Sequence, residues 1–257
     1  TNESKNKSYT LNMQGHTLSS GVVGKNVFEI FGGTVTIQHG TITGGDWGDR
    51  TNQDGKAIKA SNGVDLTLEN CVITNNKGYA KGGISNSGII NIIGGKLTIK
   101  DSNITDNVAS AGSGGGIYAS NCAVSVLGNS SISGNKVTGN YGGAMYINGG
   151  SLTIDGGEDR VQISDNSNTS YGAYGSVYVQ AAPVTIKKAD LTYNALYGIG
   201  INNTTQEVHI SDVTVTGDNM LAAVNITATT GEVSVENSSF TITNIQNLSL
   251  IHISEPT

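Results

Sequence analysis

One short phrase recurs eight times along the 257-residue chain: an apolar residue, usually two further residues, and then Asn or a substitute for Asn. The phrase opens at Ile42, Ile73, Ile104, Ile132, Ile163, Leu191, Val215 and Phe240. The steps between these positions are 31, 31, 28, 31, 28, 24 and 25 residues. A repeat of this length is typical of solenoids and related arrays, so it constrains the fold more than any other feature.

Each repeat contains two further parts. A Gly-Gly turn leads into a short apolar run, as at residues 115–118, and a second segment alternates apolar and polar residues, as at Leu97 and Ile99. This alternation predicts half-buried strands, and no segment has the 3.6-residue period of a helix. Gly and Asn between the strands suit corners with positive φ. Three strands per repeat therefore predict an all-β, single-stranded parallel β-helix of about eight to nine coils, stacked at strand spacing.

A β-sandwich also uses many short strands, but it does not explain why strand, corner and Asn return in the same register. The composition agrees with a thin tube, since Gly accounts for 36 residues, Pro for only 2, and apolar residues for 36%. Because the repeat fills most of the chain, we expect one domain over residues 9–247, preceded by a polar lead-in at residues 1–8.

The two ends carry resemblances of their own. Residues 9–18 resemble the opening coil of bacterial right-handed β-helices, which implies a right-handed tube, although Asn12 and Gln14 replace two of the usual polar residues. Residues 248–257 resemble the in-frame translation of a sequencing-library adaptor at all ten positions. We therefore expect this tail to be non-biological; the alternative is a genuine final strand.

The net charge argues against two classes of partner, and the positions of the cysteines argue against a disulfide. The formal net charge of −6 disfavours nucleic acid and anionic membrane, and no apolar run is long enough to span a bilayer. Cys71 and Cys122 lie at different places in repeats two coils apart, so we expect buried thiols rather than a disulfide. The sequence suggests no cofactor and no metal site, and we expect a monomer.

Carboxylates supply the candidates for catalysis. We expect Asp101, Asp190 and Asp212 to occupy the corner after the second strand. Other repeats carry Asn70, Asn129 and Asn237 there. Glycosidases use two carboxyl groups about 5–10 Å apart, a separation that Asp190 and Asp212 on adjacent coils would meet. The favoured alternative is a ladder of corner-capping side chains, because Asn keeps the turn and removes the charge.

Tyrosines supply the candidates for binding. Tyr118, Tyr146 and Tyr178 follow the Gly-Gly turn in three consecutive repeats, and Tyr141 precedes the same turn. Because their sequence neighbours are apolar and expected to face inward, alternation should send these tyrosines outward. One interpretation is a stabilising ladder of rings. The other is an aromatic platform for sugar rings or a protein partner.

The repeats resemble those of polymorphic outer-membrane proteins, whose passenger regions combine a Gly-Gly-Ala-Ile-type tetrapeptide with Phe-x-x-Asn. Residues 142–145 are similar to the first motif, and residues 104–107 and 132–135 to the second, with Ile in place of Phe. The resemblance covers about residues 55–200 and implies a secreted or surface-displayed, adhesin-like passenger without catalytic residues. Pectate lyases and polygalacturonases share this pectin-lyase-like fold class, but their paired Asp-Asp, Gly-His-Gly and Arg-x-Lys signatures are absent.

Three functional hypotheses follow. The first is a non-catalytic secreted or cell-surface β-helix, stalk- or adhesin-like, that binds a glycan or a host-surface protein through its tyrosine-lined face. The second is a polysaccharide lyase or glycosidase that uses Asp190 and Asp212. The third is a purely structural spacer. Clustered carboxylates beside a basic residue in one groove would favour the enzyme, and bare faces would favour the spacer.

Overall fold

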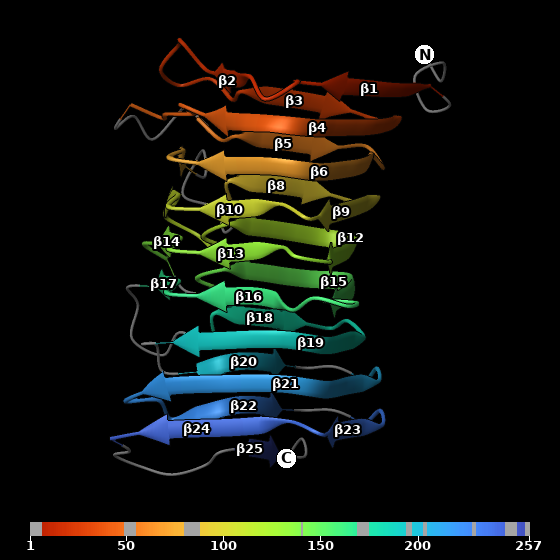
Figure 1. Cartoon of the computed structure of the whole chain (residues 1–257), viewed down its shortest axis with the longest axis vertical. Helices are drawn as coiled ribbons and strands as arrows, with labels where there is room; N and C mark the ends of the chain where they lie inside the picture. Colours follow the sequence, from red (N-terminus) through yellow and green to blue (C-terminus); the bar gives the residue numbers. More distant parts are fainter. Residues whose placement is uncertain are drawn as a thin grey trace.

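The computed structural model describes residues 7–48, 55–79, 88–139, 141–168, 175–193, 197–202, 205–227, 230–244 and 251–254. Every regular element in these ranges is a β-strand, and the strands stack into an elongated rod (Figure 1). The named strands pair only in parallel, as in β4 with β6, β12 with β15, and β19 with β21. No helix in the described ranges has the length and apolarity needed to cross a bilayer.

Three columns of strands form the sides of the rod. The first consists of β1 (Ser8–Asn12), β4 (Thr34–Thr43), β6 (Asp65–Thr74), β9 (Lys96–Lys100), β12 (Ile117–Leu127), β15 (Met145–Asp155), β19 (Val184–Tyr193), β21 (Val208–Asp218) and β23 (Val233–Glu236). The second consists of β2 (Thr17–Ser19), the ends of β4 and β6, β10 (Asn103–Thr105), β13 (Ser131–Ser133), β16 (Val161–Ser164), the ends of β19 and β21, and β24 (Ser239–Thr243).

The third column consists of β3 (Phe28–Phe31), β5 (Ile58–Ser61), β8 (Ile90–Ile93), the starts of β12 and β15, β18 (Val177–Gln180), β20 (Tyr197–Asn202), β22 (Ala222–Thr227) and β25 (Ile251–Ser254). A small sheet of β7 (Lys77–Tyr79), β11 (Val108–Ser110), β14 (Lys136–Val137) and β17 (Ser167–Asn168) borders the middle of the rod. The predicted parallel, coiled architecture is confirmed.

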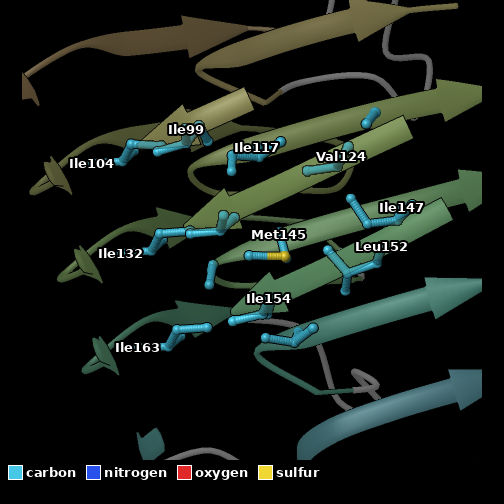
Figure 2. Packing of buried hydrophobic residues seen from close by; sticks show 14 of the residues in the cluster. Ile99, Ile104, Ile117, Val124, Ile132, Met145, Ile147, Leu152, Ile154 and Ile163 are labelled. Carbon is cyan, nitrogen blue, oxygen red and sulfur yellow. The ribbon is translucent and has the colours of Figure 1, made fainter. Parts of the chain in front are cut away.

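The inward residues of successive coils lie in register and form one continuous core. Leu97 pairs with Val124, and Val124 pairs with Leu152; all three side chains are buried. The isoleucines that open the repeated phrase, such as Ile104 and Ile132, form a second buried column (Figure 2). Burial of each such side chain contributes about 1.5–3 kcal/mol, so the alternation seen in the sequence is the main stabilising pattern of the tube.

A ladder of four buried asparagines closes the phrase in consecutive coils: Asn76, Asn107, Asn135 and Asn166. Each Nδ2 of the first three donates to the Oδ1 of the next asparagine, at 3.0, 2.9 and 2.9 Å. Asn107 Nδ2 also donates to the carbonyl oxygen of Ile73 at 2.9 Å, and Asn107 Oδ1 accepts the backbone N–H of Asn76 at 3.0 Å. The amides thus pair the polar groups that the tube buries.

The positive φ expected for Asn between the strands is found at residues such as Asn70, but the phrase-ending asparagines are not themselves the corner residues. The positive φ belongs to the preceding residue, as in Asn75 (53°), Asp106 (54°) and Asp165 (55°). The left-handed residue turns the chain, and the asparagine after it then points into the tube. Asn194, the next in the series, lies outside the described residues.

Both cysteines are free and buried in the core, which confirms the predicted thiols. Burial raises the pKa of Cys122 to about 12, so this thiol stays protonated at neutral pH.

At the C-terminal end, β25 pairs in parallel with β22, and Ile251 lies beside Val224. The tail thus adds a strand to the third column. Its adaptor origin and the domain limits stay predictions.

Candidate functional site

The three predicted tyrosines lie one above another on neighbouring strands of the third column. Tyr118 pairs with Tyr146, and Tyr146 pairs with Tyr178. The ring centroids are 5.6 Å apart in the first pair and 5.5 Å apart in the second. The rings form a cluster separate from the main core, as expected for side chains that point away from the inward column.

Of the two interpretations, the burial of these rings favours the stabilising ladder over an open platform. Tyr118, Tyr146 and Tyr178 are only 4, 7 and 3% exposed. Tyr141, from the preceding turn, packs against this group, with its ring centroid 4.9 Å from that of Tyr178 and 5.7 Å from that of Tyr146. Alternation predicts the direction of a strand residue, but it does not show which side chains from the turns cover it. The ring faces are therefore used mainly for packing.

The tyrosine hydroxyl groups hold a row of amide side chains at the outer margin of the cluster. Tyr146 Oη donates to Gln180 Oε1 at 2.8 Å, and Asn202 Nδ2 donates to Tyr178 Oη at 3.0 Å. Asn148 occupies the equivalent place relative to Tyr118, two residues beyond its register partner Tyr146. We call Asn148, Gln180 and Asn202 the amide row. Each partner lies one coil further on and two residues beyond the tyrosine position.

The electrostatics of the cluster keep the hydroxyl groups available as hydrogen-bond donors. Burial, together with the neighbouring tyrosines, raises the pKa of Tyr146 to about 12. The residues of the amide row are only partly buried, so part of each remains accessible. Sequence reasoning missed this row. The amide beside each tyrosine comes from the next coil. The only signal in the sequence was therefore a polar residue two positions after each tyrosine.

The two candidate catalytic aspartates come together around one arginine. Arg160 lies directly before β16. Its Nε donates to Asp190 Oδ1 at 2.9 Å, and its Nη1 donates to Asp212 Oδ1 at 2.8 Å. Gln162 Nε2 donates to the second carboxylate oxygen of Asp190 at 3.0 Å. Charge-assisted bonds of this type fix side-chain orientation, so the arrangement ties three successive coils together.

The predicted corner position is right for Asp212 and wrong for Asp190. Asp101 and Asp212 have positive φ values of 48° and 51°, and Asn70 and Asn237 have positive φ values of 51° and 50°. In the coil of Asp190 the corner is taken by Lys188, with φ 51°. Asp190 directly precedes the inward Leu191, so strand alternation places it on the outer surface of β19 instead. Asn129 does not take the corner either, since the positive φ there belongs to Gly128 (65°).

The charges around Asp190 oppose a role as a general acid. Burial alone favours the neutral form, but hydrogen bonds from Gln162 and Arg160 outweigh it and hold the pKa of Asp190 below its usual value. An acid that protonates a glycosidic oxygen needs the opposite, a raised pKa.

Among the described residues, no three His, Cys, Asp or Glu side chains gather in a way that could hold a metal ion.

The family to which the chain belongs follows from its similarity to a known protein family. A family model described as "right handed beta helix region" matches residues 4–159, which is more than half of the chain. The chain belongs to this right-handed β-helix family. No curated protein and no solved structure gives a significant match. Membership in the right-handed β-helix family agrees with the stacked parallel strands and assigns no activity to the tyrosine cluster or to the Arg160 group.

Proposed function

We propose that this right-handed β-helix is a non-catalytic, stalk- or adhesin-like segment of a secreted or cell-surface protein, and that it binds a glycan or a host-surface protein along the amide row. The rod shape suits display of a surface away from an attachment point (Figure 1). The proposal for its location rests on the resemblance of the repeats to outer-membrane passenger regions.

The observation that carries the binding proposal is the set of bonds between buried tyrosines and half-exposed amides. Tyr146 fixes Gln180, and Tyr178 fixes Asn202, which in turn accepts a 2.7 Å bond from Thr227 Oγ1. Side chains already held in one orientation lose less conformational entropy when a ligand binds. Amide side chains can also donate hydrogen bonds to the hydroxyl groups of sugars and accept hydrogen bonds from them, as the polar groups of ligand sites do.

The Arg160 group brings two carboxylates beside a basic residue, which is the cluster expected to favour a lyase or glycosidase. The hydrogen bonds within the cluster, however, count against the enzyme hypothesis. The guanidinium contacts both candidate carboxylates, and Gln162 takes the remaining oxygen of Asp190. The lowered pKa of Asp190 opposes a role as the neutral acid of a glycosidase. A purely structural spacer does not need oriented amides at its surface. Binding measurements therefore distinguish the spacer hypothesis from the adhesin-like one.

The test is an array of linear microbial, plant and host glycans, probed with the folded chain and with two variants. Gln180→Ala removes an amide of the row, and Tyr146→Phe removes only the hydroxyl that orients it. We expect at least one glycan class to bind, with clearly weaker binding for both variants. Asn237→Ala, at an exposed corner, is the matched control and should bind normally. Failure of every glycan to bind, or undiminished binding by both row variants, would contradict the glycan proposal.

A further inference from the structure

The amide row is part of a longer line of polar side chains that runs along the third column. Five residues pair in strand register from coil to coil: Ser120, Asn148, Gln180, Asn202 and Thr227. All five are uncharged and only partly buried. Their strands, from β12 to β22, follow one another along the rod (Figure 1). Because β8 pairs with β12 and β25 pairs with β22, this line lies within the stack and not at either end.

Two neighbouring amides in this line present hydrogen-bond donors that the described part of the chain leaves unused. An amide nitrogen carries two hydrogen atoms, whereas the amide oxygen only accepts. Gln180 Oε1 accepts the bond from Tyr146, but Gln180 Nε2 makes no hydrogen bond to a described residue. Asn202 Oδ1 accepts from Thr227, and Asn202 Nδ2 uses one hydrogen for its bond to Tyr178 Oη. The complement of the remaining N–H groups is an acceptor such as a sugar hydroxyl or ring oxygen.

The corner that follows the row leaves these groups open to approach from that side. Gly149 directly follows Asn148, and Ala181 directly follows Gln180. Both corner residues have positive φ values, 71° and 53°. A hydrogen atom and a methyl group are too short to cover the neighbouring amides, and Ala181 is itself exposed. A ligand that approaches from this corner therefore meets no long side chain at these two residues.

The side chains of the third column favour an uncharged ligand. None is charged in the five segments that carry the line: residues 117–120, 145–148, 177–180, 197–202 and 222–227. Residues 189–257 contain no Lys or Arg at all. Arg and Lys supply the charge-assisted bonds through which carboxylate and phosphate groups are usually recognised. The net charge of −6 would also repel an anionic polysaccharide, so the ligand class that fits is neutral.

The spacing of the row matches one ligand geometry. Gln180 and Asn202 are register partners on adjacent strands, so their backbones lie about 4.8 Å apart along the rod. In an extended chain of β-1,4-linked sugars, successive residues advance by a similar distance, whereas α-1,4-linked glucans coil. A chain of the first kind that lies parallel to the rod axis presents one sugar to each coil. A ligand that crosses the rod would instead meet the side chains of one coil only.

We propose that the amide row binds a neutral, extended, β-1,4-linked polysaccharide that lies along the rod with one sugar at each coil. This inference rests on the proposed binding function and names its ligand class. The unused N–H groups of Gln180 and Asn202 donate to oxygen atoms of successive sugars. The bonds with Tyr146 and Tyr178 hold both amides in position for this contact. A ligand shorter than the row leaves some of its donors unused, so affinity depends on chain length.

Calorimetric titration of the full chain with oligosaccharides of increasing length tests this ligand class. The neutral β-1,4-linked probes are cello-, manno- and N-acetylchito-oligosaccharides; malto-oligosaccharides change the linkage, and oligogalacturonates add charge. We expect at least one neutral β-1,4-linked series to bind. Its affinity should increase up to about four sugars, one for each coil from Asn148 to Thr227.

Variants of the row test the orientation of the ligand. Asn148→Ala and Gln180→Ala should each weaken binding of the tetrasaccharide several-fold, because the two amides lie in different coils. Asn103→Ala is the matched control, since it removes an exposed amide from the second column, and it should bind normally. Thermal unfolding of each variant checks that the fold persists.

Two results would overturn this inference and leave the proposed binding function in place. One is preferred binding of malto-oligosaccharides, oligogalacturonates or another glycan of the array, still weakened by Gln180→Ala. The other is weaker binding by Gln180→Ala but not by Asn148→Ala, because the ligand would then cross the rod. If no glycan of any series or of the array binds, the glycan-binding function itself is contradicted.

Discussion

Replacement of Asn107 by Asp should lower the free energy of unfolding by roughly 4 kcal/mol or more at neutral pH, because it leaves a buried charge without a partner. Asn107 Nδ2 donates to Ile73 O and to Asn135 Oδ1, both at 2.9 Å. A carboxylate has no proton to donate, so it would place negative oxygen atoms against two acceptors. Urea unfolding followed by circular dichroism measures the loss.

The matched control is Asn103→Asp, which adds the same charge on β10, where the side chain is exposed. We expect this control to change stability by less than about 0.5 kcal/mol, as for most surface substitutions. Asn107→Ala should fall between the two, since it removes the donor without adding a charge. Equal stability of Asn107→Asp and Asn103→Asp would show that the asparagine ladder does not stabilise the tube.

Replacement of Gly150 by Ala should cost roughly 3 kcal/mol or more, because backbone strain and a steric clash act together. Gly150 has a φ of 85°, and a Cβ atom there would lie 2.1 Å from the carbonyl oxygen of Cys122. That oxygen belongs to the neighbouring coil, so the clash can be relieved only by separating the stacked strands. Thermal unfolding measures the effect.

Gly63 provides the control for the conformational part of this cost. Its φ is 72°, but no atom lies within 4 Å of a Cβ built at that position. Gly63→Ala should therefore cost only about 1–2 kcal/mol for the left-handed conformation. If both variants lose the same stability, close stacking of the coils at Gly150 is not the reason that glycine is required there.

The fold could be predicted from the sequence because its main determinant is periodic. The inward column of Leu97, Val124 and Leu152 follows from alternation within each repeat and from the constant position of the repeats. Parallel pairing then follows, since equivalent segments stack on one another. The asparagines at the ends of the phrases were visible in the same way, but their role was not. Of the adjacent Asn75 and Asn76, only the structure shows that the first turns the chain and the second is buried.

The site was less predictable because its contacts join residues from different coils. The position of Tyr146 on the outer side of its strand followed from alternation, whereas its covering by Tyr141 did not. The bond to Gln180 depends on the offset between coils, which no single repeat contains. The hydrogen bond from Arg160 to Asp190 depends on the conformation of the turn between β15 and β16, which the repeat does not determine.

Distances between spin labels along one outward column test the stacked-coil account most directly. Thr36, Thr67, Thr98, Ser125, Thr153, Thr185, His209 and Ser234 are successive register partners. With one label at Thr36, pulsed electron paramagnetic resonance should give separations near 19 Å to Thr153, 24 Å to Thr185 and 34 Å to Ser234, at about 4.8 Å per coil. A linear increase with coil number is the predicted result. Separations that do not increase along the series would contradict the account.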